Sequence, residues 1–386
     1  MPYDITINIL LKLPVISLLR FKCVCKLWRS LIEDPQFIKF HGDMSKNDMH
    51  RHKIFLIGGE CDNKDDYFYS LDVPLQHDSV ASLLEPPIPG INQLSRVCFT
   101  SSCSNGIILL VFPYDLIVLW NPSIRESRKI PSPILKKRLR KRFPAIYGFG
   151  YVSSTDDYKI VRVGKKDTSA GYYEVDLFST RTDSWKLIGK FPPNNFFFEG
   201  DIVTVDGIVY MRAMTYWSMN ECTILSFCLE AEQFQEVLFP DRVQRFQDPV
   251  LYVLGENLCL TRLHDNSSRD FEVWCMKKDG LMSNPWSKIL TIPSMHSGRC
   301  LRPVSFTKTN GDIVFMRNKG YFEVYNSNRH EFEVVEVVGL EGPLYFNWLV
   351  SYAESLFSPK QAWIQNFKKM NARVQKKNTY LNGLKF

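Results

Sequence analysis

Histidine side chains are the first groups in this sequence that could hold a metal ion or move a proton, and only two of the seven stand close together. His50 and His52 are separated by one residue, with no cysteine or acidic partner at the spacing that a zinc site uses. We therefore interpret the pair as part of an exposed loop and predict no metal site.

The cysteines could bind zinc or form disulfides, but their spacing argues against both. No Cys-x-x-Cys pair occurs anywhere, so neither a zinc site nor a disulfide scaffold is supported. Most cysteines lie in apolar runs, such as residues 258–260 and 274–276, where a free thiol behaves as a small buried hydrophobe. We predict free thiols and a reducing cytoplasmic or nuclear setting. The cysteines are Cys23, Cys25, Cys61, Cys98, Cys103, Cys222, Cys228, Cys259, Cys275 and Cys300.

Motifs of common catalytic sites are missing from the sequence. It contains no Gly-x-x-x-x-Gly-Lys phosphate loop, no Gly-x-Ser-x-Gly elbow and no His-Glu-x-x-His zinc motif. Two acidic pairs, Asp65-Asp66 and Asp156-Asp157, stand in turn-like surroundings where carboxylates usually face solvent. These observations favour a binding protein with no catalytic residues and no cofactor, although an enzyme is left open because a missing motif is a weak argument.

The net charge of +7 could indicate a nucleic-acid partner. However, residues 360–386 hold seven basic residues and no acid, which accounts for the whole excess. A second basic run, residues 136–142, lies between two prolines, and we interpret it as a solvated loop, with a nuclear-import or phosphate-binding patch as the alternative. We predict no specific nucleic-acid partner.

The N-terminal stretch is apolar but is interrupted by Asp4, Lys12 and Pro14. We therefore predict neither a signal peptide nor a membrane span.

The first 41 residues have the pattern of short helices. Ile5, Ile9 and Leu13 recur at helical spacing, and Asp34 followed by Pro35 supplies an N-cap and a first helical residue. About forty residues with this much apolar surface can barely form a core of their own. The helices must therefore either bind a partner or pack on the rest of the chain, and periodicity alone leaves both open.

From residue 53 onward the sequence changes to short β-branched and aromatic runs broken by Gly, Asn, Asp or Pro, which is typical of strands and turns. A recurring unit begins after Asn-Gly or Asp-Gly and ends at Pro or Gly. We predict a mainly β fold, with a small helical module followed by a β-propeller-like domain of about six blades, because the spacing brackets the ~40–50-residue period of propeller blades. A sandwich or an open meander is the alternative. By subtraction, the closing positions lie 61, 48, 53 and 46 residues apart: Pro131, Pro192, Pro240, Pro293 and Gly339.

Two further features follow from this repeat. We expect residues 53–59 and the last strand to close the ring. Trp120, Trp185 and Trp274 recur within the repeats, so we interpret them as blade-core residues in preference to platforms for stacking a ligand.

The helical module carries a specific pattern. Residues 2–4, 9–14 and 17–28 read Pro-Tyr-Asp, Ile-Leu-Leu-Lys-Leu-Pro and Ser-Leu-Leu-Arg-Phe-Lys-Cys-Val-Cys-Lys-Leu-Trp. This pattern resembles the F-box of plant F-box proteins over the whole module, residues 1–41, except that the family motif opens Leu-Pro and here Met1 precedes Pro2. The resemblance implies binding to the Skp adaptor, which brings in cullin and RING subunits. It assigns adaptor binding to Pro2, Ile5, Ile9, Leu10, Leu13, Pro14, Leu18, Leu19, Val24, Cys25 and Trp28.

Three stretches of the repeated region resemble the F-box-associated interaction domain of plants, in the style of the S-locus and S-haplotype F-box branch. They are residues 118–125, residues 148–151 with 157–161, and residues 352–356. The resemblance implies that residues 53–358, joined to the F-box by a linker over 42–52, present propeller loops to a protein that is to be ubiquitinated. A non-ligase scaffold with a degenerate F-box and a propeller enzyme are the alternatives.

The tail, residues 359–386, departs from the family, whose members commonly stop soon after the third stretch. Ser358, Pro359 and Gln361 form the pattern of a capping box. Apolar residues follow at helical spacing among basic ones, which predicts a basic amphipathic helix. It either packs on the propeller or binds an acidic partner or membrane surface. The apolar stripe consists of Trp363, Phe367, Met370 and Val374.

Overall fold

The computed structural model describes most of the chain. The described residues are 3–60, 66–75, 79–89, 102–133, 145–164, 172–191, 196–215, 222–240, 247–263, 270–277, 285–293, 301–307, 312–317, 321–340 and 344–360. Residues 361–386 of the predicted tail helix and the basic run 136–142 lie outside these residues.

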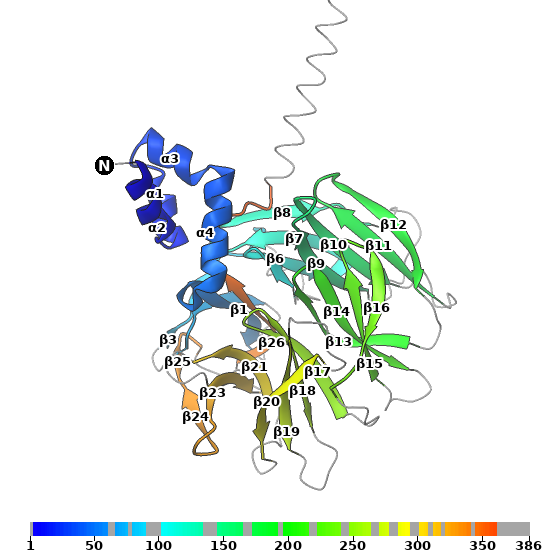
Figure 1. Ribbon diagram of the computed structural model, residues 1–386. Coiled ribbons are helices and arrows are strands. Elements are labelled where there is room, and N and C mark those ends of the chain that lie inside the picture. The colour runs from blue at the N-terminus through cyan, green and yellow to red at the C-terminus, as the bar shows by residue number, and fades with distance from the viewer. Residues whose placement is uncertain are drawn as a thin grey trace, which may run out of the picture.

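The N-terminal module consists of four helices: α1 (Tyr3–Leu11), α2 (Val15–Phe21), α3 (Lys26–Ile32) and α4 (Pro35–Asn47) (Figure 1). The predicted cap of α4 is confirmed, because Asp34 Oδ1 accepts hydrogen bonds from the backbone N–H groups of Gln36 (2.8 Å) and Phe37 (3.2 Å). Residues 42–52, assigned to a linker, form the end of α4, the 3-10 turn η1 (Met49–Arg51) and the first residue of the first strand. The module is therefore joined to the β domain by a continuous helix and a tight turn.

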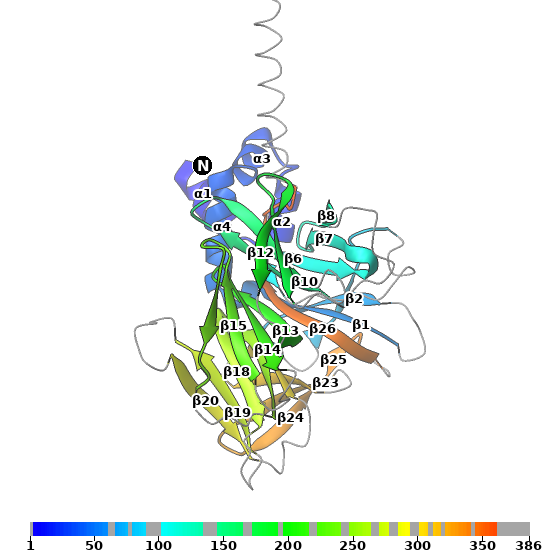
Figure 2. The same cartoon turned by 90° about the vertical axis from the view of Figure 1, so that its right-hand side faces the viewer.

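Four-stranded antiparallel sheets form the six blades of a propeller, which confirms the predicted fold (Figures 1 and 2). Blades 2 to 6 are each a meander of four consecutive strands, whereas blade 1 combines strands from both ends of the domain. Blade 1 contains β1 (His52–Glu60), β2 (Tyr67–Asp72), β4 (Ser82–Leu84) and β26 (Leu344–Ala353); blade 2 contains β5 (Cys103–Ser104), β6 (Ile107–Phe112), β7 (Leu116–Asn121) and β8 (Glu126–Ile130); blade 3 contains β9 (Ile146–Val152), β10 (Asp157–Gly164), β11 (Tyr173–Ser179) and β12 (Ser184–Phe191).

Blades 4 to 6 repeat the same arrangement. Blade 4 contains β13 (Phe196–Val205), β14 (Ile208–Thr215), β15 (Cys222–Cys228) and β16 (Gln233–Val237); blade 5 contains β17 (Gln247–Leu254), β18 (Asn257–Leu263), β19 (Phe271–Met276) and β20 (Trp286–Ile292); blade 6 contains β21 (Leu301–Phe306), β22 (Ile313–Arg317), β23 (Tyr321–Asn326) and β24 (Glu331–Val335). Two short strands, β3 (Ser79–Val80) and β25 (Val337–Val338), pair in parallel beside blade 1.

Closure of the ring uses both ends of the domain, as the sequence predicts. The last strand, β26, pairs with β1 from His52 opposite Ala353 to Glu60 opposite Leu344. This pairing spans almost the whole β domain in sequence, so blade 1 forms only when the two ends of the domain meet.

Tight turns and close blade packing explain the Gly-rich signatures. Asn105-Gly106 and Asp206-Gly207 take the left-handed backbone conformation in turns between the first two strands of blades 2 and 4. Gly148 on β9 leaves room for the neighbouring blade, because a Cβ atom there would lie 2.3 Å from Val209 Cγ1. The predicted Asn-Gly and Asp-Gly turn signals therefore mark real strand boundaries.

Apolar side chains fill the space between blades. Trp120 and Trp274 are buried in such clusters, which confirms their predicted role, whereas Trp185 is half-buried on an outer strand. Its Nε1 donates to the Pro131 carbonyl (2.6 Å) at the end of the preceding blade. Trp286 Nε1 donates in the same way to the Leu238 carbonyl (2.7 Å). These bonds fasten outer strands to their neighbours.

Two predictions are wrong. Cys259 and Cys275 are not free thiols: they lie directly opposite each other on β18 and β19, with Cα atoms 4.1 Å apart, and form a disulfide. Asp157 and Asp66 do not face solvent; both are buried. Asp157 accepts from Ser179 Oγ, Thr180 Oγ1 and the Arg181 N–H, so it ties the start of β10 to the turn after β11.

Candidate functional site

Helices α1 to α3 expose large apolar side chains that the module's own core does not cover. They come from both sides of the α1–α2 connection, from the turn between α2 and α3 and from the start of α3. We call them the module surface: Ile5 (48% exposed), Ile9 (45%), Ile16 (50%), Val24 (61%) and Leu27 (55%). Large exposed apolar side chains gathered on one small module are typical of a protein-binding site.

The predicted adaptor-binding residues divide into three groups. Ile5, Ile9, Pro14, Val24 and Cys25 are exposed. Leu13, Leu19 and Trp28 are half-buried. Pro2 lies outside the described residues.

Leu10 and Leu18 form the third group, and both are buried inside the module. They pack in one cluster with Ile32, Phe37 and Leu356. In this structure they hold the helices together, and a partner would contact their neighbours.

Sequence reasoning missed two residues of the module surface, Ile16 and Leu27. A signal existed for Ile16, because Val15 and Leu18 define the buried face of α2 and Ile16 points away from it. An apolar residue on the polar face of an amphipathic helix indicates a partner. The position of Leu27 depends on how α3 packs, which the sequence pattern does not specify.

Charged groups fix the module to the propeller. Glu354, just after β26, accepts from the Val15 backbone N–H (3.4 Å) at the start of α2 and pairs with Lys53 Nζ (3.3 Å) on β1. Arg51 donates through Nη2 to the Leu11 carbonyl (3.1 Å) at the end of α1. Both ends of the α1–α2 connection are therefore tied to the start and the end of the propeller.

His41 on α4 lies at the same junction. Its Nε2 donates to the Leu13 carbonyl (2.9 Å), and burial lowers the pKa of the imidazole below its usual value. A neutral side chain at this position agrees with a structural role.

His50 and His52, which the sequence predicts to lie in an exposed loop, differ from each other in the structure. His50 is exposed, as predicted. His52 is half-buried at the start of β1 and donates to the Lys46 carbonyl (2.9 Å).

Asn121 brings two of the sequence signatures together. Its side chain is fully buried, and Nδ2 lies 3.0 Å from the Ser355 carbonyl, 3.0 Å from Ser355 Oγ and 2.9 Å from the Phe357 carbonyl. Leu356, between those two carbonyls, packs into the helical module. The stretches 118–125 and 352–356 therefore meet where the module sits on the propeller.

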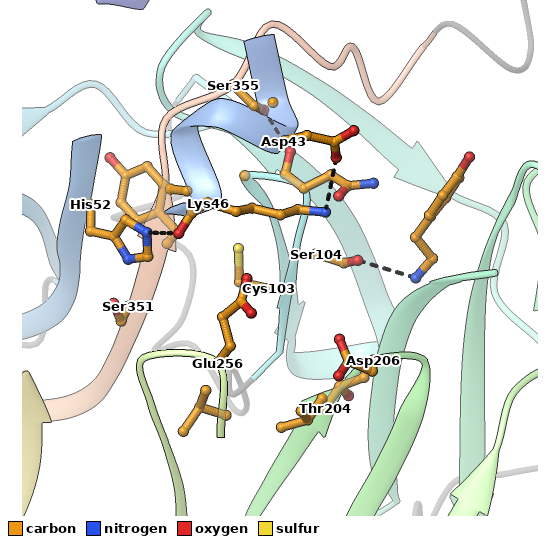
Figure 3. A pocket seen from close by; sticks show the side chains of 18 of the residues that line it. Asp43, Lys46, His52, Cys103, Ser104, Thr204, Asp206, Glu256, Ser351 and Ser355 are labelled. Atoms are coloured by element: carbon orange, nitrogen blue, oxygen red, sulfur yellow. Dashed lines mark hydrogen bonds and ion pairs between the residues drawn. The ribbon is translucent and has the colours of Figure 1, made fainter. Parts of the chain in front are cut away.

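A pocket opens beside α4, at the end of the propeller that carries the module (Figure 3). It has a volume of about 400 Å³, and we call it the mouth pocket. One wall is α4, and the others are turns of blades 2 to 5 and the end of β26. Its lining includes Lys39, Asp43, Lys46, Cys103, Ser104, Asn105, Tyr151, Thr204, Asp206, Glu256 and Ser351.

The lining of the mouth pocket includes the Cys103 thiol. Burial raises the pKa of the Cys103 thiol to about 12, so it stays protonated and is a poor nucleophile near neutral pH. Among the residues that the structure describes, no three His, Cys, Asp or Glu side chains are grouped so as to hold a metal ion.

In the part of the chain that the structure describes, no helix is long and apolar enough to cross a membrane.

Comparison with known proteins agrees with both modules. Residues 1–40 match the F-box domain, and residues 62–358 match the F-box associated beta propeller domain. The F-box/kelch-repeat protein At3g23880 of Arabidopsis thaliana is 26% identical over 352 residues, covering 86% of this chain and 89% of the relative. The F-box protein CPR1 of the same plant is 29% identical over 350 residues, covering 82% and 79%.

These relatives do not single out the S-locus branch, which stays a prediction. The domain matches cover both the helical module and nearly all of the propeller. The chain belongs to the family of F-box proteins that carry an F-box associated beta propeller domain.

Proposed function

We propose that this protein is the substrate-recognition subunit of a Skp-cullin-F-box ubiquitin ligase. The F-box domain indicates binding to a Skp-type adaptor, and the observation that carries the proposal is the module surface, where five large apolar side chains are 45–61% exposed. Covering such side chains removes apolar area from water, which is the main driving force of association. Ile5, Ile9, Ile16, Val24 and Leu27 would form the centre of the contact.

In this proposal the propeller binds the protein to be ubiquitinated, and the chain has no catalytic step of its own. The cullin and RING subunits would reach it only through the adaptor. The direct links between the module and both ends of the propeller support this division of labour, because they would hold a bound target in a constant direction relative to the adaptor. We place the protein, as part of the same proposal, in the cytoplasm or nucleus.

Charge substitution on the module surface tests the proposal. Ile9→Glu with Val24→Glu should abolish co-purification of the Skp adaptor, because burying two unpaired carboxylates opposes binding. Leu187→Glu is the matched control, since Leu187 is 56% exposed on β12 of the propeller rim. Circular dichroism checks that all variants are folded. Unchanged capture of the adaptor by the double variant would remove the assignment.

A degenerate F-box on a non-ligase scaffold is the alternative, and a reconstituted reaction separates the two. With adaptor, cullin, RING subunit and a charged conjugating enzyme present, the wild-type chain should support adaptor-dependent transfer of ubiquitin, at least to itself. The double variant should lose this transfer. A wild-type chain that binds the adaptor and never supports transfer would favour the scaffold.

A further inference from the structure

A second group of exposed apolar side chains lies on the propeller itself, at the rim where blade 6 meets blade 1. Here β3 and β25 pair in parallel, with Val80 opposite Val338 (Figure 1). Val80 is 60% exposed, Val338 is 45% exposed, and Leu83, on the short outer strand β4, is 65% exposed. We call these three residues the rim patch. Exposed apolar side chains that lie together indicate a binding surface.

The fold turns the rim patch outward at the junction of the two blades. Ala81 and Val337, which follow Val80 and precede Val338 along the chain, pack into the apolar cluster between blades 6 and 1. Because successive side chains of a strand point to opposite faces, Val80 and Val338 lie side by side on the outer face.

Leu83 belongs to the same junction. It lies opposite Tyr69 in the pairing of β4 with β2, and Tyr69 packs against the cluster between blades 6 and 1. Side chains opposite each other in an antiparallel pair share one face of the sheet. Leu83 is therefore on the side of β4 that faces blade 6.

The surroundings of the rim patch are acidic. Residues 79–89 and 330–340 contain no lysine or arginine, and their four carboxylates are all exposed. A partner of this surface should therefore be apolar and positively charged. The four carboxylates belong to Glu85, Glu331, Glu333 and Glu336.

Two of these carboxylates already have a basic neighbour. Glu85 lies 4.0 Å from Arg125, and Glu333 lies 3.7 Å from Arg329, in pairs whose side chains are exposed. The other two have no ion-pair partner among the residues that the structure describes. The surface therefore keeps a negative charge that its own arginines do not balance.

The described part of the chain ends close to the rim patch. Ser358 donates through Oγ to Glu126 at the start of β8. Arg125, next to Glu126, pairs with Glu85, which stands two residues after Leu83. A segment that continues from Ser358 thus starts beside the acidic surface.

We propose that the rim patch binds the chain's own C-terminal tail, residues 361–386. The apolar stripe of Trp363, Phe367, Met370 and Val374 covers the patch, and the basic residues of the tail lie beside its carboxylates. The tail holds six basic residues and no acid, so its charge is complementary to this surface. It is long enough, because 26 residues span about 39 Å as a helix. The docked tail straps the last blade to the first.

Photo-crosslinking in the full chain tests the proposal. Phe367 is replaced by p-benzoylphenylalanine, and after irradiation the crosslinked peptides are identified by mass spectrometry. The main crosslinks should join the tail to residues 79–84 and 336–340 of the same chain. Crosslinks mainly to another blade, to the helical module or to a second copy of the chain would overturn the proposal, as would their absence.

Charge substitution in the rim patch provides the second arm. Val80→Lys with Leu83→Lys should lower the crosslink yield at least about tenfold, because it replaces apolar contacts by charges of the same sign as the tail. Leu187→Lys with Leu238→Lys is the matched control, since these side chains are 56% and 68% exposed on blade 3 and beside β16 of blade 4. A full yield in the rim-patch variant would contradict the assignment.

Hydrogen exchange gives a readout that leaves the rim patch itself unchanged. Trp363→Ser with Phe367→Ser should speed exchange of residues 79–84 and 337–340 at least about threefold, because the tail no longer covers them. Residues 233–237, the outer strand of blade 4, should keep their rate. Equal rates at residues 79–84 and 337–340 in this variant and the wild type would show that the tail docks elsewhere.

Discussion

Replacement of Asn121 tests whether the propeller and the F-box are fastened by the hydrogen bonds of one buried amide. Asn121→Ala removes the donor to the Ser355 and Phe357 carbonyls and the acceptor for the Ser123 N–H (2.9 Å). A typical hydrogen bond contributes ~1 kcal/mol net, and a buried group left without its partner costs more. We expect a loss of about 3 kcal/mol of unfolding free energy, since three such bonds disappear.

Asn121→Asp is the sharper variant, because it keeps the shape and removes only the donor. Its carboxylate would face the Ser355 and Phe357 carbonyls without a proton to share, so the loss should equal or exceed that of alanine. The matched control is Asn326→Ala. Asn326 ends the third strand of blade 6 as Asn121 does in blade 2, and it accepts from two turn N–H groups.

Urea unfolding of the chain purified with its adaptor measures the free energies, and hydrogen exchange of residues 354–357 locates the effect. Asn326→Ala should cost only about 1 kcal/mol, the value of a turn contact. Adaptor binding should survive in all variants, because the module surface is untouched. A wild-type free energy for Asn121→Asp at neutral pH would refute the reasoning, since shape and not hydrogen bonding would then hold the junction.

Three further predictions concern packing and charge. Gly148→Ala should cost ~1–3 kcal/mol by overpacking, because its Cβ would lie 2.3 Å from Val209, whereas Gly189→Ala, with nothing within 4 Å, should be nearly neutral in thermal unfolding. Leu10→Ala should destabilise the module by ~2–5 kcal/mol, while Ile9→Ala should leave stability unchanged and weaken adaptor binding; the reverse pattern would show that the structure assigns their faces wrongly. Burial alone raises the pKa of Glu272, but hydrogen bonds from Trp274, Arg262 and Lys288 outweigh it and lower the pKa below 4.5. The pairing therefore stabilises the fold above about pH 4.5 and is lost as pH falls below it, so the stability gap between wild type and Glu272→Gln should shrink from pH 7 to pH 3.5 in urea titrations.

Local signals predicted the elements of this fold because each has a local cause. The Asp34 cap and Pro35 start α4 whatever surrounds it, and the left-handed Asn105-Gly106 and Asp206-Gly207 turns mark strand pairs. The closing position Pro131 follows β8 directly, and Pro293 follows β20. The six units close into a ring, in which the first and last strands pair with each other.

The register in which two strands pair and the direction in which a side chain faces could not be predicted from the sequence, because both depend on tertiary contacts. Cys259 and Cys275 are 16 residues apart, and only the alignment of β18 with β19 makes them neighbours. Asp156 and Asp157 look alike in sequence, yet the strand that starts at Asp157 turns its carboxylate inward. On α1, apolar residues surround the helix, so spacing alone could not separate the buried Leu10 from the exposed Ile9.

Helix α4 links the two candidate binding regions, and this sets how they can be separated by experiment. Phe37, Ile38 and His41 face the module, while Asp43 and Lys46 line the mouth pocket. The helix has 13 residues and is therefore about 20 Å long, with no hinge between its two roles. A substitution at Asp43 or Lys46 could disturb both regions, because the same backbone carries the buried face one residue away.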